Sequence, residues 1–587
     1  MKLSSLEELT LNAEQIQDDL LEKILRLNSN TEYLRRFLHG SNDKELFKKN
    51  VPLANYEDVK PYIERVANGE PSDLISGGPV TRFFRSSGTS GGKQKIFPVN
   101  DEAIEQLGYV LALRSLVMSK HFSDNGVEQG KTMEFHYTKP ESTTPSGLPV
   151  AAAFTNEVVR FGATFAHALV RAIDFLESNW KELCGNIRLG HVSEWITDLG
   201  CRSSVSAIIG GPNPELADLI EQECSHKSWE GIVTRLWPKA KRIECVLTGQ
   251  MAQYIPILDF YCNKLPLVST VYGSSESIFG FNVDPLCKPQ DVSYTFVPNT
   301  SYFEFLPVDH EGDMTSIVDL VNVKLGCYYE PVVTSCFGLN RYLIGDILEV
   351  TGFYNNTPQF RFVRRKNMVL SVETETTTED DILKALARAT FVLESSNLML
   401  MDFTSSADIS TFPGHYVFYW ELKGKEVNDV LVLDEKTLMG CCYVLEESFG
   451  STYRLKRRTG LIGALEIRVV EQGTFNSLTD YFISRGSSRA QYKTPLCINS
   501  SEASAVLENK VLARFHSENG GGRCKERRWS HGGSELGIVW VTAVEVMVAT
   551  ARGTPEGSWI RGCEGRRRHE FAANVERVTS NRSCAVL

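Results

Sequence analysis

The sequence predicts an α/β protein with more than one domain, and three observations support this. Apolar runs of strand length, such as residues 243–249, alternate with helical stretches, such as residues 167–187, a pattern typical of α/β folds. The chain has 587 residues, enough for two or three domains that each bury a core. The segment "ETETTTE" at 373–379 contains no apolar residue. It predicts a break between domains.

We therefore predict a large N-terminal domain over residues 1–372 and a smaller C-terminal domain over 373–516. A fresh helix is expected at 379–393, directly after the polar break. The tail, 517–587, is rich in arginine and glycine and contains no aspartate. Because it has no period typical of a further domain, we expect a disordered appendage or a reading frame that is not ancestral coding sequence.

Within these domains the spacing of apolar residues predicts individual elements. Residues 14–38 carry apolar side chains at helical spacing and predict a helix that packs on a core. Strands are expected at 265–273, 342–354, 415–422 and 465–470.

The composition excludes several classes of protein. A net charge of −11 argues against a nucleic-acid-binding protein. The 14 cysteines are scattered without a C-x-x-C pair, which predicts free thiols in a reducing compartment. No apolar run is long enough to span a membrane or to form a signal peptide. We therefore expect a cytoplasmic monomer with no membrane partner.

The most informative stretch is "RSSGTSGGKQKIFPV", residues 85–99, which is dense in glycine and hydroxyl side chains. Such a loop offers backbone N–H and hydroxyl donors to anionic oxygens, and the lysines that follow suit phosphate. Neither the P-loop nor the dinucleotide-binding spacing is present. Apolar runs flank the loop on both sides, so we predict strand, loop and strand, with the next helix near Asp101.

The same loop matches G-x-S-x-G formally, with Ser90 at its centre. A serine hydrolase that uses Ser90 is therefore a second hypothesis. That motif requires a strand that turns directly into a helix, whereas a second strand is predicted here. The candidate bases are His136, His191 and His415, and no sequence motif around them indicates a catalytic histidine.

Further polar groups follow strand-like runs. "VYGSSE" at 271–276 places Glu276 after an apolar strand, where a carboxylate can hold Mg²⁺ beside phosphates. Gly345–Asp346 interrupts the strand-like run at 342–354, and Lys493 lies late in the small domain. Each alone is also typical of a turn or of a solvated side chain.

Taken in order, these segments resemble the adenylate-forming enzymes. "SSGTSGG", "TPSGLP", "ELCGNIR", "DPLCKPQDVSYTF" and "QYKTP" further resemble one branch, the plant acyl-acid–amido synthetases of the Gretchen Hagen auxin-responsive family. The resemblance runs from about residue 14 to 515 and is strongest to the members that conjugate benzoate-type acids to glutamate. It implies a large α/β domain with a β-barrel portion and a smaller mobile α/β domain, in a firefly-luciferase-like adenylate-forming architecture.

The resemblance also implies an activity. Such an enzyme activates a small plant acid (benzoate-, salicylate-, jasmonate- or auxin-like) as acyl-AMP and joins it to an amino acid, using ATP and Mg²⁺. Lys493 would contact the α-phosphate, Glu276 the Mg²⁺, and Asp346 the ribose hydroxyls. Arg114 would pair with the acyl carboxylate, with Leu111 one helical turn before it. The remaining nucleotide-binding residues implied are Ser86, Ser87, Thr89, Thr248, Tyr272, Gly273, Ser274 and Ser275.

The chain departs from the family at several places: Leu111 stands where an aromatic residue is expected, the ribose motif at 340–346 lacks one aromatic and one arginine, and the arginine expected after "TPSGLP" is replaced within 150–152. The largest departure is a missing segment. The chain continues from "SGLPVAAAFT" almost directly to "NEVVRFGATFA", where the family has a few dozen further residues. We therefore predict an internal deletion near 150–157. An inactive paralogue and a faulty gene model stay open as alternatives to a working ligase.

Overall fold

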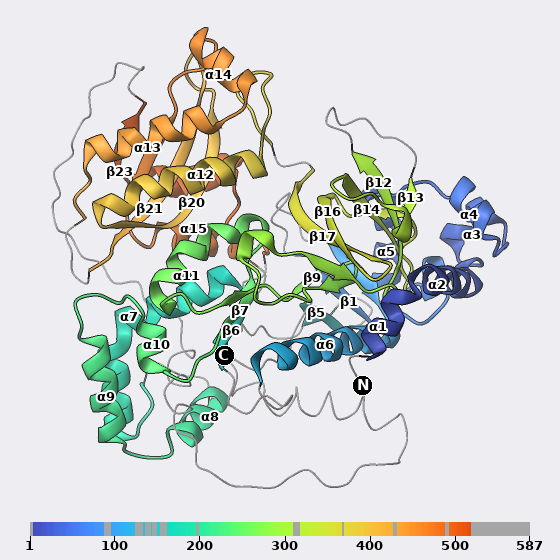
Figure 1. The fold of residues 1–587 in the computed structure, drawn as a ribbon, viewed down its shortest axis with the longest axis horizontal. Coiled ribbons are helices and arrows are strands. Elements are labelled where there is room, and N and C mark those ends of the chain that lie inside the picture. The colour runs from blue at the N-terminus through green and yellow to red at the C-terminus, as the bar shows by residue number, and fades with distance from the viewer. Residues whose placement is uncertain are drawn as a thin grey trace.

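The computed structural model describes residues 4–86, 95–123, 133–135, 142–143, 149–152, 161–194, 199–308, 317–366, 369–426, 431–487 and 492–517. In Figure 1 the chain starts with blue helices at the right and reaches the orange and red elements at the upper left. Across these described segments, no helix has the length and apolar character needed to cross a membrane.

Helices α1 to α5 open the chain. The single helix predicted over 14–38 is wrong, because the structure has two: α2 (Ala13–Asn28) and α3 (Glu32–Leu38). The break arises at Thr31, whose hydroxyl accepts a hydrogen bond from Leu34 N and caps the second helix. The others are α1 (Ser4–Leu11), α4 (Lys44–Asn50) and α5 (Tyr56–Ala67).

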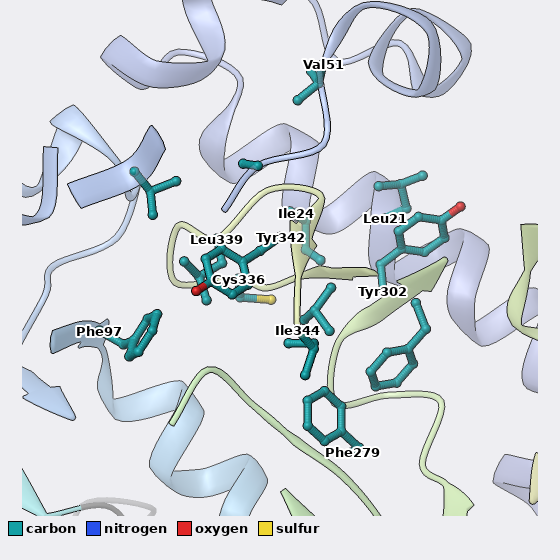
Figure 2. Packing of buried hydrophobic residues seen from close by; sticks show 14 of the residues in the cluster. Leu21, Ile24, Val51, Phe97, Phe279, Tyr302, Cys336, Leu339, Tyr342 and Ile344 are labelled. Carbon is teal, nitrogen blue, oxygen red and sulfur yellow. The ribbon is translucent and has the colours of Figure 1, made fainter. Parts of the chain in front are cut away.

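The largest sheet has nine strands in the order β13-β12-β14-β16-β17-β11-β10-β9, with β15 beside β14. Its pairings are antiparallel. Leu21 and Ile24 of α2 pack against its buried face, near Tyr302 and Ile344 (Figure 2). The strands are β9 (Val271–Gly273), β10 (Ile278–Phe281), β11 (Tyr294–Phe296), β12 (Tyr302–Val308), β13 (Val318–Asp319), β14 (Tyr328–Thr334), β15 (Tyr342–Leu343), β16 (Asp346–Tyr354) and β17 (Thr357–Arg365).

The glycine-rich segment has the predicted strand–loop–strand form. β1 (Arg82–Arg85) pairs antiparallel with β2 (Ile96–Val99), and α6 (Asp101–Phe122) begins at the predicted residue. The Asn100 side chain caps α6 by accepting from Ala103 N at 2.9 Å. β1 also pairs in parallel with β5 (Pro149–Ala152), and β5 pairs antiparallel with β4 (Ser142–Thr143). The predicted deletion junction thus begins on a strand beside the loop, and residues 153–160 lie outside the described residues.

A further four-stranded sheet of the N-terminal part is parallel, with the strand order β3-β6-β7-β8. The single strand predicted at 265–273 is divided between the two sheets, because β8 joins β7 while β9 joins β10. The elements here are β3 (Met133–Phe135), β6 (Phe161–Phe165), α7 (Ala166–Leu189), α8 (Leu199–Ile209), α9 (Pro214–Cys224), α10 (Ile232–Leu236), β7 (Ile243–Val246), the 3-10 helix η2 (Gly249–Tyr254), α11 (Ile255–Cys262) and β8 (Leu267–Val268).

The C-terminal part has its own four-stranded sheet, in the order β20-β21-β22-β23, and its own core around Phe403 and Trp420. We keep the domain boundary near 372 as a proposal, which this separate core supports. Residues 518–587 lie outside the described residues. The elements are β18 (Val369–Leu370), β19 (Thr377–Thr378), α12 (Glu379–Leu393), β20 (Leu398–Asp408), β21 (His415–Gly424), α13 (Glu435–Ser448), α14 (Ser451–Arg458), β22 (Glu466–Val470), α15 (Thr474–Ser484), α16 (Ser501–Glu508) and β23 (Val511–His516).

Candidate active site

The base of the glycine-rich loop is closed by two hydrogen bonds. Ser86 N donates to the Lys95 carbonyl at 2.8 Å, and Ser86 Oγ accepts from Lys95 N at 2.9 Å. The Lys95 ammonium lies over the Tyr56 ring, 5.2 Å from its centroid. The predicted phosphate contacts Ser87 and Thr89 lie outside the described residues.

The structure brings Tyr272 and Asp346 together, as predicted for one site. Tyr272, in β9, donates its hydroxyl hydrogen bond to Asp346 Oδ2 at 2.7 Å. Its ring stacks on Phe279 and on Tyr294, with centroid distances of 4.9 and 5.5 Å. Both Tyr272 and Asp346 are buried. The aromatic stack therefore fixes the donor that orients the carboxylate.

The second oxygen of Asp346 faces a cation. Arg365 Nε lies 3.0 Å from Oδ1, because residues 346 and 365 are directly opposite in the β16–β17 pair. Within the described segments, however, no donor is aligned with Oδ1 as a hydrogen bond. A buried carboxylate oxygen in this state can accept a hydroxyl from a ligand.

Thr248 lies between β7 and η2, as the residue that precedes η2. Its hydroxyl is 3.3 Å from the Tyr294 hydroxyl, and Tyr294 stacks on Tyr272. Thr248 therefore lies one side chain away from the Tyr272–Asp346 pair, on the neighbouring sheet.

The turn that follows β9 contains Gly273, Ser274, Ser275 and Glu276. Ser274 N donates to the Ser277 carbonyl at 2.8 Å, and Ser274 Oγ accepts from Glu276 N at 3.2 Å. Burial raises the pKa of Glu276, against the opposing effects of the Ser274 hydroxyl, Arg365 and Lys95. This turn borders a hollow of about 370 Å³, counting the solvent at its mouth, whose other walls include Phe84, Gln106, Leu107 and Phe337.

Lys493, from the C-terminal part, reaches the same region. Its ammonium lies 4.4 Å from the centroid of Phe165, at the end of β6. Burial and then Arg365 lower the pKa of Lys493 to about 8, against the attraction of Asp346 and Glu379. Within the described residues, these charges and burial account for the shift, and no hydrogen bond to Lys493 contributes to it. A cation held in this way suits an anionic ligand that arrives from outside the chain.

Arg114 has a partner that the sequence did not reveal. Its Nη2 lies 2.6 Å from Glu244 Oε2 in a fully buried ion pair, and Glu244 also binds Arg242. Arg114 Nε has no hydrogen-bond partner in the described part of the chain. Leu111 is half-buried on the same helix, which also contributes Gln106 and Leu107 to the hollow.

The sequence reasoning missed Arg365 and Glu379. Glu379 accepts a hydrogen bond from Arg365 N at 3.0 Å, and burial raises the pKa of Glu379. Together these residues connect β17, which carries the Asp346 partner, to the first turn of α12. The sequence does show the charged run that ends β17. It does not show the strand register that places Arg365 opposite Asp346.

The hydrolase hypothesis finds little support in the described residues. β1 leads through the loop into β2 and not into a helix, which a nucleophile elbow requires. Nε2 of His415 pairs with Glu466 at 3.1 Å on the C-terminal sheet, and His191 is exposed. Ser90 and His136 lie outside the described residues.

Comparisons with known proteins identify the family. The chain matches the GH3 family N-terminal domain over residues 2–158 and 152–267, the central domain over 294–365 and the C-terminal domain over 380–502. The N-terminal match is in two segments, which overlap at residues 152–158.

Curated relatives cover most of the chain. It is 54% identical over 563 residues to the 4-substituted benzoates-glutamate ligase GH3.12 of Arabidopsis thaliana, covering 87% of this chain and 97% of the relative. It is 47% identical to the indole-3-acetic acid-amido synthetase GH3.17 of the same plant, with 88% and 96% covered. The solved structure of the AtGH3.15 acyl acid amido synthetase in complex with 2,4-DB superposes with a TM-score of 0.81 at 47% identity, covering 90% and 98%. The family models, the curated relatives and the solved structure all cover most of the chain's length: this chain belongs to the GH3 family.

Proposed function

We propose that this protein is an ATP-dependent acyl acid amido synthetase, which activates a small carboxylic acid as acyl-AMP and joins it to an amino acid. One observation carries the proposal most directly: Lys493 of the C-terminal part lies over Phe165 of the N-terminal part, near enough to the paired Asp346 and Arg365 for both charges to affect its pKa. A ligand between the two parts would meet a carboxylate acceptor and a cation. A nucleoside monophosphate offers ribose hydroxyls for the carboxylate and a phosphate for the cation.

The proposed reaction has two steps, adenylation of the acid and formation of the amide, and the cationic and donor groups of the site suit the first of them. In the first step, a carboxylate oxygen of the acid attacks the α-phosphorus of ATP, and the bond to pyrophosphate breaks. Negative charge spreads over the phosphate oxygens, and the Lys493 ammonium and the donors of the loop beyond Ser86 would stabilise it. In the second step, the amino-acid nitrogen attacks the acyl carbon, AMP leaves with the bonding electrons, and the nitrogen loses a proton. We assign the nucleotide contacts to Ser86, Ser87, Thr89, Thr248, Tyr272, Gly273, Ser274, Ser275 and Asp346.

We assign Mg²⁺ to Glu276. The described residues contain no group of three or more metal-binding side chains, which fits an ion that is held by one or two carboxylates together with substrate phosphates. The half-buried Glu276 carboxylate, beside the serine-rich turn, is such a ligand. When bound, the ion would neutralise charge on the departing pyrophosphate.

We propose a benzoate-type acid, of which salicylate is one example, as the acyl substrate, and glutamate as the amino acid. The 54% identity to a benzoates–glutamate ligase supports this choice. We assign the acyl carboxylate to Arg114, whose buried Nε has no hydrogen-bond partner in the described residues, although its Nη2 is paired with Glu244. We further propose that the enzyme acts as a cytoplasmic monomer in plant hormone homeostasis.

Product analysis tests the proposed function. The purified protein is incubated with ATP, Mg²⁺, 4-hydroxybenzoate and glutamate, and the amide is identified by mass spectrometry. We expect the benzoyl–glutamate amide and an equal amount of AMP. ADP in place of AMP, or no amide with any benzoate-, auxin- or jasmonate-type acid, contradicts the proposal and favours the inactive paralogue.

A further inference from the structure

A buried polar cluster includes Thr494, the residue next to Lys493 in the chain. Asp402, on β20, is 1% exposed, and its Oδ2 accepts the hydroxyl of Thr494 at 2.9 Å. Its Oδ1 accepts from the backbone N of Phe403 at 2.9 Å. Arg171 Nη2 lies 3.5 Å from Oδ2, and Thr494 is fully buried. Thr494 is the residue that follows Lys493 in the chain.

The cluster connects three segments. Arg171 belongs to α7 of the N-terminal part, Asp402 to β20 of the C-terminal sheet, and Thr494 to the segment that carries Lys493. β20 also holds the next residues of this segment, since Thr404 Oγ1 donates to the Pro495 carbonyl at 2.6 Å and Ser405 N to the Leu496 carbonyl at 2.8 Å. Among these contacts, the Asp402 carboxylate is the group that also reaches α7.

The contact between Asp402 and Arg171 lies in a buried setting, so its strength depends on the charges of the two side chains. Burial raises the pKa of Asp402 to about 7, against the attraction of Arg171 and the Thr494 hydroxyl. Tyr254, Tyr492 and His167 pack around the cluster, and burial lowers the pKa of His167 to about 3, so it adds no positive charge. A buried carboxylate that loses its donor or its cation is strongly disfavoured. The cluster therefore favours one placement of α7 relative to the Lys493 segment.

We propose that Asp402 is a positioning residue for Lys493: its carboxylate ties the Thr494 hydroxyl to Arg171 and so fixes the lysine where the two parts of the chain meet. This role rests on the proposed function, because it assigns Lys493 to the adenylation step. Lys423 makes a second bridge to α7, with Nζ at 2.9 Å from Asp174 and 2.7 Å from Glu177. That bridge holds the two parts together but does not touch the Lys493 segment.

A hydroxyl-deletion series in the full-length protein tests the role. Thr494→Val keeps the side-chain shape and removes the donor, Thr494→Ser keeps the donor, and Ser405→Ala is the matched control. Ser405 Oγ also donates to this segment, to the Leu496 carbonyl at 2.6 Å, but has no link to α7. We expect Thr494→Val to lower kcat for acid-dependent pyrophosphate exchange about tenfold, with KM for ATP changed less than about twofold. Thr494→Ser and Ser405→Ala should stay within about twofold of wild type. An equal loss in Ser405→Ala, or no recovery in Thr494→Ser, overturns the role.

A measurement without catalysis separates the two claims. Lys493 is labelled with an amine-reactive acylating reagent at pH 8, and its modification is followed by mass spectrometry. We expect Thr494→Val to be labelled about tenfold faster than wild type, because the untied segment opens more often, and Ser405→Ala to match wild type. Unchanged labelling in Thr494→Val overturns the positioning role. A wild-type protein that gives no pyrophosphate exchange contradicts the proposed function, whatever the labelling shows.

Discussion

Tyr272 donates its hydroxyl hydrogen bond to Asp346 at 2.7 Å, across 74 positions of the chain. This contact joins the two sheet strands, β9 and β16, whose ends carry the predicted nucleotide site. It also leaves Asp346 Oδ1 without an aligned donor in the described residues, beside the Arg365 cation. A ribose hydroxyl fits this acceptor.

Asp346→Ala should weaken the binding of ATP with Mg²⁺ by about 1–3 kcal/mol, because a hydrogen bond to a charged acceptor is lost. Calorimetric titration of the folded protein measures this change. Tyr272→Phe is the control: it removes the orienting hydroxyl but keeps the carboxylate, so its effect should be smaller. Equal affinities for wild type and Asp346→Ala contradict the site assignment.

The amine of Lys493 should become reactive at a lower pH than ordinary lysines. Burial and Arg365 lower its pKa to about 8, whereas an unperturbed lysine titrates near 10.4. The neutral amine is the nucleophile, so acylation of Lys493 should rise through about pH 8. Added ATP should move this midpoint upward, since phosphate charge favours the ammonium form. Mass spectrometry of the labelled peptides gives the profile, and a midpoint near that of exposed lysines contradicts the buried placement.

Glu244→Gln should destabilise the protein by about 3–5 kcal/mol, because Arg114 and Arg242 are then buried without their counter-charge. Urea unfolding measures the free energy of unfolding. Glu221→Gln provides the matched control, since Glu221 pairs with Arg188 at the surface and should matter by less than about 1 kcal/mol. Similar effects of the two substitutions on the free energy of unfolding would contradict a buried ion pair between Arg114 and Glu244.

Ser90 should not act as a nucleophile. The loop leads from strand to strand, so a fluorophosphonate probe should leave the wild-type protein unmodified. Stoichiometric labelling that disappears in Ser90→Ala favours the hydrolase hypothesis over the ligase. Mass spectrometry of the intact protein distinguishes the two results.

Local signals predicted the local structure well. The α12 helix spans the predicted residues because Thr378 and Asp381 form a capping box at its start, and α6 begins at Asp101 because Asn100 caps it. The prediction was wrong where a single residue ends an element, as at Thr31, or where one apolar run serves two sheets, as at 265–273.

The partners of the site residues could not be predicted from the sequence. Arg114 and Glu244 are 130 positions apart, and Arg171 and Asp402 are 231 positions apart. Such pairs depend on how separate elements pack and leave no periodic pattern. The resemblance to a family supplied which residues share a site, and the structure supplied the groups that hold them.

Acid-dependent exchange of labelled pyrophosphate into ATP tests the central claim most directly, because it reports acyl-adenylate formation without the amino acid. We predict exchange that requires a benzoate-type acid and Mg²⁺ and that falls about a hundredfold or more in Lys493→Ala, since Lys493 would stabilise the charge on the phosphate oxygens. Exchange without the acid, or no exchange by the folded wild-type protein, contradicts the account.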